Sequence, residues 1–173
     1  MNFTLTYDGS LPSNARPQQK HDLRLAFHPQ LADLRRQPGI GQNADRVAPV
    51  EVGGRRFTSL VHPEWKFRAE LDITMLRPED PGHVIVRSDI DNRLKTLFDA
   101  PMRPQHPQDV PNNWSSGPDE DPLHCLLDDD SLIKSVSVRT DRLLAPANEA
   151  HVKLIMRVAI QTTVVFGGLM LLR

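Results

Sequence analysis

Strict alternation of apolar and polar residues from Phe67 to Met75 is the feature of this 173-residue sequence that most limits its fold. The odd positions of the segment are all apolar, and the even positions between them are polar or charged. Because successive side chains of a strand point to opposite faces, this period of two predicts a β-strand with one buried face. The chain therefore builds a sheet that packs one side on a core and turns the other to water.

Weaker patterns along the chain supply the remaining elements of the predicted fold. Helical spacing of apolar residues predicts a helix over 22–36, interrupted by Pro29, and a second helix over 91–99. Residues 37–54 are rich in Gly, Asn and Pro and are predicted to form a loop. Further strands are predicted at 3–7, 84–86, 131–140 and 151–160. We expect an α+β fold in one domain spanning 1–173, with a mixed sheet of four to six strands and flanking helices.

A proline-rich acidic stretch interrupts these elements. From Pro101 to Asp130 the sequence has six prolines, and its seven acids against one base give a local charge of −6. The whole chain has a net charge of −1, so the other residues together carry +5. Prolines and acids at this density predict an irregular surface excursion over 101–126. The charge asymmetry permits a basic face elsewhere on the molecule, which nucleic-acid binding would require.

Composition excludes several classes of protein. A single cysteine cannot form an internal disulfide, which excludes a disulfide scaffold and favours the reducing cytoplasm. With 25% charged and 39% hydrophobic residues, the chain is expected to be neither wholly disordered nor an integral membrane protein. No signal peptide is visible at the N-terminus. The uncharged C-terminal segment from Val158 to Leu172 is 15 residues long, shorter than the ~20 residues that span a bilayer, so for the tail 159–173 we expect a final strand or hairpin packing on the core rather than a membrane anchor.

Two clusters of aspartates carry the chemistry that the sequence suggests. Asp89 and Asp91 stand where a strand is predicted to give way to a helix, and Asp128–Asp130 open a later predicted strand. Carboxylates brought together raise one another's pKa unless a cation neutralises them, and Mg²⁺ prefers such oxygen ligands. A metal-bound water is a strong nucleophile toward phosphate esters. Lys95, one helical turn beyond Asp91, would neutralise a phosphate beside such a metal.

Each cluster also has a simpler interpretation as a helix cap, a turn or a solvated edge. An EF-hand is excluded for Asp128–Asp130, because the alternating oxygen ligands and the central glycine are absent. The two clusters taken together are more informative than either one. Three motifs in the second half of the chain connect them: Asp89-Ile-Asp-Asn-Arg-Leu-Lys95, Leu97-Phe-Asp-Ala100 and Leu127-Asp-Asp-Asp-Ser-Leu-Ile133.

These three motifs resemble the RusA family of Holliday junction resolvases. In that family a strand leads into Asp-x-Asp-Asn-x-x-Lys on a helix that ends in Asp-Ala, and a Trp/Leu-Asp-Asp motif opens the next strand. The early Leu11-Pro-Ser-Asn14 is similar to the family's Pro-Ser-Asn turn near its N-terminus. The likeness covers roughly residues 67–160 together with this turn.

The resemblance implies a small homodimeric endonuclease that uses Mg²⁺, with Mn²⁺ as a substitute, to nick branched DNA at four-way junctions. The family's catalytic residues correspond by position to Asp89, Asp91, Lys95 and Asp130. Its metal ligands correspond to Asp89, Asp91 and Asp130, with Asp129 as a neighbouring ligand. The extra Asp128 leaves the register of the second cluster open by one residue. The matching reaction is hydrolysis of a phosphodiester by a metal-activated water.

Three features of the chain depart from the family. The excursion at 101–126 is longer and more acidic than the link expected there, and residues 22–54 have no counterpart. The net charge of −1 is low for a junction binder, because phosphate contacts supply much of the affinity. These departures favour a second hypothesis, a catalytically weak or inactive RusA-like protein that binds nucleic acid or a partner. A third hypothesis is an unrelated acidic module that binds Ca²⁺ or protein.

Basic and aromatic residues supply candidate contacts to DNA, although each of them more commonly has an ordinary structural role. Trp65 and Trp114 can stack on bases, but packing within the protein is the commoner role of tryptophan. The candidate phosphate contacts are Lys66, Arg68, Arg77, Arg87, Arg93 and Arg139.

Overall fold

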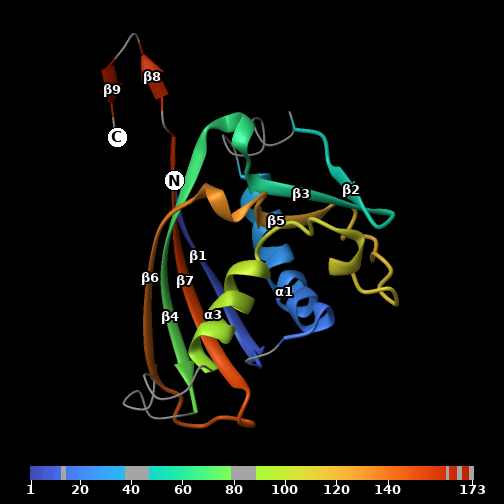
Figure 1. Cartoon of the computed structure of the whole chain (residues 1–173), viewed down its shortest axis with the longest axis vertical. Helices are drawn as coiled ribbons and strands as arrows, with labels where there is room; N and C mark the ends of the chain where they lie inside the picture. Colours follow the sequence, from blue (N-terminus) through green and yellow to red (C-terminus); the bar gives the residue numbers. More distant parts are fainter. Residues whose placement is uncertain (13–14, 38–46, 79–88, 163, 167–168, 172–173) are drawn as a thin grey trace.

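The structure is a computed structural model that describes residues 1–12, 15–37, 47–78, 89–162, 164–166 and 169–171 (Figure 1). Its described part has two α-helices and two mixed β-sheets, which confirms the predicted α+β class. The helices are α1 (Pro17–Arg36) and α3 (Asp89–Asp99). The strands of the two mixed sheets are β1 (Asn2–Ser10), β2 (Val50–Val52), β3 (Arg55–Val61), β4 (Phe67–Arg77), β5 (Leu123–Leu127), β6 (Ile133–Arg142) and β7 (His151–Thr162).

The larger sheet has the strand order β1-β7-β4-β6, and the alternating segment that begins at Phe67 forms its strand β4. β4 pairs antiparallel with β7 and parallel with β6, so the sheet is mixed. The odd positions of β4 from Ala69 to Met75 are buried, as the alternation predicts. The four strands agree with the four to six expected. The second sheet, with the order β2-β3-β5, was not predicted.

Two corners connect the sheets. β3 runs into β4 through the 3-10 turn η1 (Pro63–Trp65), and β5 runs into β6 through the 3-10 turn η4 (Asp130–Leu132). Because β3 is parallel to β5 and β4 is parallel to β6, the two corners lie side by side. Between them the backbone N–H of Asp128 donates to the carbonyl of Val61 at 3.0 Å. The second aspartate cluster is therefore held at the junction of the two sheets.

Both helices pack on one face of the larger sheet (Figure 1). α1 begins with Pro17, a residue suited to the first turn, and the N–H of Arg16 donates to the Oε1 of Gln19 at 2.8 Å. Apolar side chains of α1 and α3 then meet the buried positions of β1, β4 and β7 in one core cluster. Its helical members include Leu23, Phe27, Leu31, Leu34 and Leu97. The helix containing Lys95 is thus fixed to the sheet by its apolar side.

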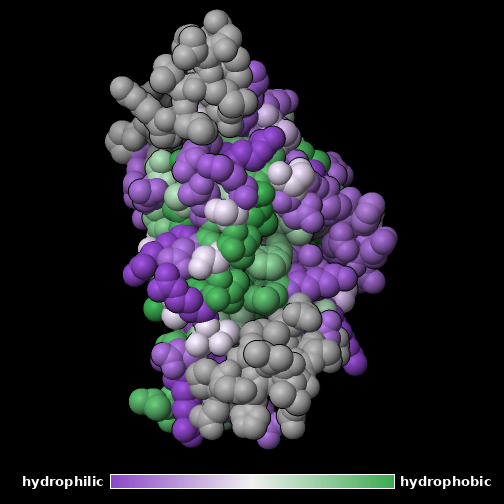
Figure 2. Space-filling view, turned by 60° about the vertical axis from the view of Figure 1, so that its left-hand side comes forward, coloured by the Kyte–Doolittle hydropathy of each residue, from purple (hydrophilic) through white to green (hydrophobic). Residues whose placement is uncertain are grey.

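The faces of the molecule differ in polarity. No helix of the described chain covers the second face of the larger sheet, where Arg68, Glu70 and Asp72 of β4 lie near Arg157 of β7. Figure 2 turns the β6 side of the molecule forward and shows apolar side chains gathered at the centre of that view, between polar margins. The molecule therefore has one polar sheet face and, on the β6 side, an area where apolar side chains reach the surface.

The prediction of an irregular excursion over 101–126 is wrong at its end, because residues 123–126 belong to β5. Leu123 and Cys125 of this strand are fully buried. The earlier part is irregular apart from the 3-10 turn η3 (Pro107–Asp109), yet it is tied to the rest of the molecule. Asp121 accepts hydrogen bonds from the guanidinium of Arg56 at 2.7 and 2.8 Å.

The other predicted elements agree with the structure to different extents. The helices predicted at 22–36 and 91–99 are confirmed as α1 and α3, and both begin earlier than predicted. The predicted loop 37–54 ends in β2, and the strand predicted at 84–86 lies outside the described residues. The strands predicted at 3–7, 131–140 and 151–160 are confirmed as β1, β6 and β7, although η4 precedes β6.

The C-terminal segment forms a hairpin of two short strands, β8 (Val164–Phe166) and β9 (Leu169–Leu171). The two strands pair antiparallel, with Val165 opposite Met170. The hairpin agrees with the final strand or hairpin that the sequence predicts, whereas the predicted packing on the core concerns side chains that lie outside the described part of the structure. In the described part of the chain, no helix combines the length and the apolarity that crossing a membrane requires.

Candidate functional site

The first aspartate pair opens α3. Asp89 and Asp91 lie in the first turn of this helix, where acidic residues interact favourably with the helix dipole. Their side chains lie outside the described part of the structure. Farther along α3, Lys95 is exposed to solvent while Leu97 is fully buried in the core. The helix therefore presents the predicted catalytic lysine on its solvent side.

The second cluster lies at the corner between β5 and β6. Asp129 caps η4, where its Oδ1 accepts a hydrogen bond from the backbone N–H of Ser131 at 2.9 Å. Hydrogen bonds from the side chain and backbone of Ser131 lower the pKa of Asp129, so this carboxyl is ionised at neutral pH. Asp130, the next residue, is exposed to solvent. Two adjacent carboxylates therefore face water at this corner.

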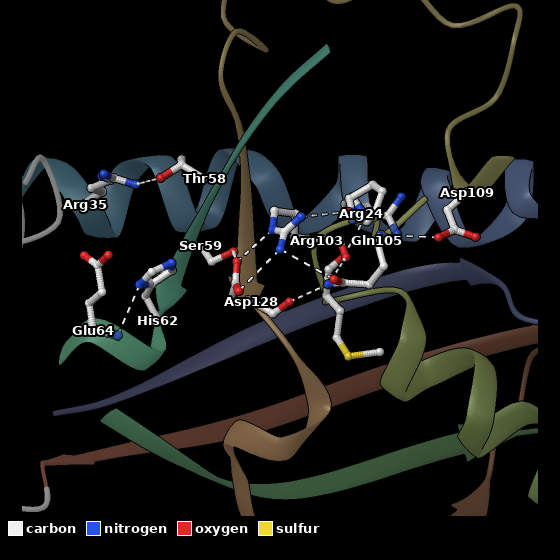
Figure 3. Close-up of polar contacts among 12 residues, drawn as sticks. Arg24, Arg35, Thr58, Ser59, His62, Glu64, Arg103, Gln105, Asp109 and Asp128 are labelled. Atoms are coloured by element: carbon white, nitrogen blue, oxygen red, sulfur yellow. Dashed lines mark hydrogen bonds and ion pairs between the residues drawn. The ribbon is translucent and has the colours of Figure 1, made fainter. Parts of the chain in front are cut away.

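Asp128 has a different role from its two neighbours, as Figure 3 shows. Its Oδ1 accepts a hydrogen bond from the Nε of Arg103 at 2.7 Å, and both side chains are only 13% exposed. The hydroxyl of Ser59 lies 3.5 Å from the same oxygen, and the Nε2 of Gln105 donates to the Asp128 carbonyl at 2.7 Å. This ion pair holds Asp128 in a structural role. The register that the sequence left open therefore favours Asp129 and Asp130 as the available acids.

The two predicted acidic pairs lie at opposite ends of α3 within one chain. Just after the helix, Met102 forms a β-bridge with Leu127, and the N–H of Leu126 donates to the Pro101 carbonyl at 2.9 Å. The C-terminal end of α3 thus adjoins the second cluster, whereas Asp89 and Asp91 begin the helix. At a rise of about 1.5 Å per residue, the helix separates its two ends by roughly 15 Å.

The described side chains contain no group of three His, Cys, Asp or Glu residues placed to hold a metal ion, but Asp89 and Asp91 are not among those side chains. The chemistry of the donor set nevertheless fits a hard cation. Asp129 and Asp130 offer carboxylate oxygens on the surface of a rigid corner, and Mg²⁺ binds through one or two such carboxylates while keeping several waters. The second cluster is therefore suited to contribute part of a magnesium site.

The candidate phosphate contacts divide into buried and accessible residues. Arg77 and Arg93 are buried and have interaction partners, so neither is a free cation on the surface. Lys66 is exposed, and Arg139 lies 4.0 Å from Asp72 on the polar face of the larger sheet. Arg68 lies on the same face, whereas Arg87 lies outside the described residues.

The two tryptophans pack within the protein. Trp114 contacts the ring of His21 with 4.3 Å between centroids and lies 6.1 Å from the ring of Phe57. Trp65 stacks on Phe67 with 6.4 Å between ring centroids. The interpretation of Trp114 as a packing residue of the excursion is supported, because it joins the excursion to α1 and β3.

A polar cavity of about 290 Å³ beside the C-terminal end of α3 was missed by the sequence reasoning. Its charged groups are largely paired within the protein: the Nζ of Lys20 lies 2.6 Å from Asp99, and the Nε of Arg24 donates to the Met102 carbonyl at 3.0 Å. No signal in the sequence connects these residues, because they are brought together from α1, the end of α3 and the excursion. The cavity is lined by Lys20, Arg24, Asp99, Arg103, His106 and Asp109, among others.

No family model, curated protein or solved structure matches this chain. The likeness to RusA-type resolvases therefore rests on the motifs of the sequence itself, and the site must be argued from the chemistry and placement of its residues.

Proposed function

We propose that the chain is a Mg²⁺-dependent endonuclease that nicks branched DNA by phosphodiester hydrolysis. The observation that carries this proposal is the unequal use of the three consecutive aspartates at the β5–β6 corner. Arg103 neutralises Asp128, whereas Asp129 is held ionised and Asp130 is exposed beside it. Two adjacent carboxylates without a cation partner of the Arg103 kind are available to bind a divalent ion, as a metal site requires.

In the proposed reaction each residue acts through its ordinary chemistry. Asp89 and Asp91 at the start of α3, and Asp129 and Asp130 at the β5–β6 corner, are two separate pairs that would each bind Mg²⁺, and the bound ion would activate water and stabilise charge on the phosphate. Lys95, exposed on α3 one turn beyond Asp91, compensates the negative charge that grows on the phosphate oxygens. The exposed positions of Asp130 and Lys95 leave the proposed site accessible to a large substrate.

A second candidate function is favoured by the separation of the acidic pairs along α3. Within one chain roughly a helix length lies between them, which would leave each pair with an incomplete ligand set. A protein of this kind would bind branched DNA or a partner without cutting it. The two functions differ in whether metal-dependent turnover occurs.

The deciding experiment compares a labelled four-way junction with linear duplex of the same sequence, in Mg²⁺, in Mn²⁺ and in EDTA. Metal-dependent nicks confined to the junction support the nuclease. Binding without nicks supports the second candidate, and neither binding nor nicks contradicts both.

Asp91→Asn tests the first acidic pair directly. Removing one ligand charge weakens metal binding, so we expect junction cleavage to fall by at least about 100-fold while the circular dichroism spectrum is unchanged. Asp33→Asn is the matched control, because Asp33 is an exposed aspartate on α1. Full activity of Asp91→Asn would remove Asp91 from the metal site.

A further inference from the structure

A buried arginine lines the polar cavity beside the C-terminal end of α3. The cavity has a volume of about 290 Å³ and is formed by α1, the end of α3 and the segment that follows it. Arg24 of α1 is only 3% exposed, and its side chain lines this cavity. A charge removed from water is costly unless a partner of opposite charge compensates it. The partners of Arg24 therefore indicate what the cavity can hold.

The hydrogen bonds of Arg24 go to neutral groups. Its Nε donates to the carbonyl of Met102 at 3.0 Å, and its Nη1 lies 3.3 Å from the Nδ1 of His21. Burial lowers the pKa of His21 to about 4, so this ring is neutral near pH 7 and does not compensate the guanidinium. Among the described residues Arg24 has no ion pair with a carboxylate, and its Nη2 makes no hydrogen bond. A cation and one of its donors thus remain for a molecule in the cavity.

The two acids that line the cavity have donors of their own. Asp99 accepts a hydrogen bond from the Nζ of Lys20 at 2.6 Å. The Oδ2 of Asp109 accepts from the backbone N–H of His106 at 3.0 Å. Burial lowers the pKa of Arg24, and the negative charges of Asp109 and Asp99 offset only part of this effect. Compensation of Arg24 within the described lining is therefore incomplete, and an anion in the cavity would complete it.

The walls of the cavity fit an organic phosphate better than a bare ion. Lys20 and Arg103 add two further cations, each paired with an aspartate, and Figure 3 shows Arg103 beside Arg24 where α1 meets the segment after α3. A guanidinium presents paired N–H donors that match the oxygens of a phosphate group. The volume of about 290 Å³ is close to the lower limit of about 300 Å³ for small-molecule pockets. Apolar groups for contact with an organic substituent come from Pro17, Met102 and Pro104.

We propose that this cavity binds the terminal phosphate of a phosphate monoester and that Arg24 is its main contact. The anion compensates the buried guanidinium, whose hydrogen-bond partners in the described chain are neutral. None of the aspartates of the proposed metal site is among the described residues that line the cavity, so the proposal does not depend on the nuclease function. A free nucleotide and the phosphorylated end of a DNA strand present the same group, and the experiment distinguishes these two sources.

Calorimetric titration of the full chain tests the binding with two pairs of probes. Adenosine 5′-monophosphate is compared with adenosine, and a 5′-phosphorylated single-stranded oligonucleotide with the same strand lacking the phosphate. We expect the phosphorylated member to bind at least about 10-fold more tightly, the factor that one charge-assisted hydrogen bond supplies. A preference in the nucleotide pair alone assigns the site to a free monoester, and a preference in the oligonucleotide pair assigns it to a strand end. Equal binding within both pairs, or no binding of any probe, overturns the proposal.

Arg24→Met tests the main contact, because it removes the guanidinium and keeps an unbranched side chain. We expect binding of the preferred phosphorylated probe to weaken by at least about 10-fold, while the circular dichroism spectrum is unchanged. Arg35→Met is the matched control: Arg35 also belongs to α1, donates to the hydroxyl of Thr58 at 2.6 Å and is not among the lining residues. This control should bind the probe as the wild type does.

Lys20→Met answers the same question if Arg24→Met does not fold. It leaves the carboxylate of Asp99 without its cation beside the bound phosphate, so binding should weaken by a similar factor. A folded Arg24→Met variant that keeps the wild-type preference for the phosphate overturns the proposal. If Arg24→Met is unfolded, the same preference in Lys20→Met overturns it.

Discussion

At the scale of single residues, the three consecutive aspartates show how neighbours in sequence acquire different properties. Asp128 directly follows β5 and pairs with Arg103, Asp129 caps a 3-10 turn, and Asp130 is exposed to solvent. A buried carboxylate needs a paired cation, whereas an exposed one does not. The sequence alone could not distinguish the three, because their separation depends on Arg103, which lies 25 residues earlier.

The Arg103–Asp128 pair makes a measurable contribution to stability. Arg103→Met leaves Asp128 largely buried without its cation, so the free energy of unfolding should fall by about 3 kcal/mol in urea denaturation. Arg36→Met, which removes an exposed pair with Asp33, should change it by less than about 0.5 kcal/mol. Equal effects of the two substitutions would show that the inward pair does not support the corner.

His21 gives the molecule a pH-dependent stability. Burial, with a smaller effect from Arg24, lowers the pKa of His21 from 6.5 to about 4, so the folded chain holds the ring neutral. Between these values the unfolded chain binds the proton and the folded chain does not. The contribution is therefore complete above pH 6.5 and is lost as the pH falls toward 4, by about 3 kcal/mol in all.

The measurement is urea denaturation at pH 7 and at pH 4 for wild type and His21→Phe, which keeps a ring against Trp114. His21→Phe should lose less stability on acidification than wild type, whereas His106→Gln, at an exposed position, should lose as much. The same loss in wild type and His21→Phe would rule out His21 as the titrating group.

At the scale of elements, the sequence predicted the strands that have one buried face and one solvent-exposed face. β4 and β7 alternate along their length and were found by that pattern. β3 was missed, because its last five residues, Phe57–Val61, are all buried and a strand buried on both faces does not alternate. β5 was missed because its five residues follow directly on a proline-rich segment, and four of them are buried.

α3 allows stability and catalysis to be separated within one element. Leu97 is fully buried, so Leu97→Ala should lower the free energy of unfolding by about 3 kcal/mol. Lys95→Ala on the exposed side should leave stability within about 0.5 kcal/mol and still reduce junction cleavage, if Lys95 compensates charge on the phosphate. Unfolding curves and nicking rates of both variants check this, and a Lys95→Ala variant that cleaves at the wild-type rate removes the proposed role of Lys95.

At the scale of the whole molecule, the candidate site was only partly predictable. The motifs identified the acidic pairs, and the structure assigns Asp128 to the framework and keeps Asp129 and Asp130 at the surface. The distance between Asp129 and Asp130 and the start of α3 could not be predicted from the sequence. It arises because β6 is parallel to β4, so the chain runs back along α3 before β6 begins. The pattern of residues along the chain predicts helices, strands and candidate site residues, whereas the distance between the two acidic pairs depends on how the strands are connected.

Metal binding should also be visible without cleavage. If Mg²⁺ binds the folded protein and not the unfolded chain, a concentration ten times the dissociation constant stabilises the fold by about 1.4 kcal/mol. We expect thermal denaturation of wild type to shift upward with Mg²⁺, and Asp130→Asn to lose most of this shift. A shift of the same size in wild type and Asp130→Asn would place the ion elsewhere.

The hydrogen bonds of Gln30 at β1 have a consequence for how large an assembly this protein can form. A sheet with two receptive edges can add neighbours without limit, and such growth ends in fibres. Among the described strands β6 has an unpaired outer edge, whereas at the β1 edge Gln30 already occupies the N–H and the carbonyl of Thr6. Addition of a strand to the larger sheet is therefore blocked at Thr6 of β1, so any growth of that sheet has to proceed from the β6 side.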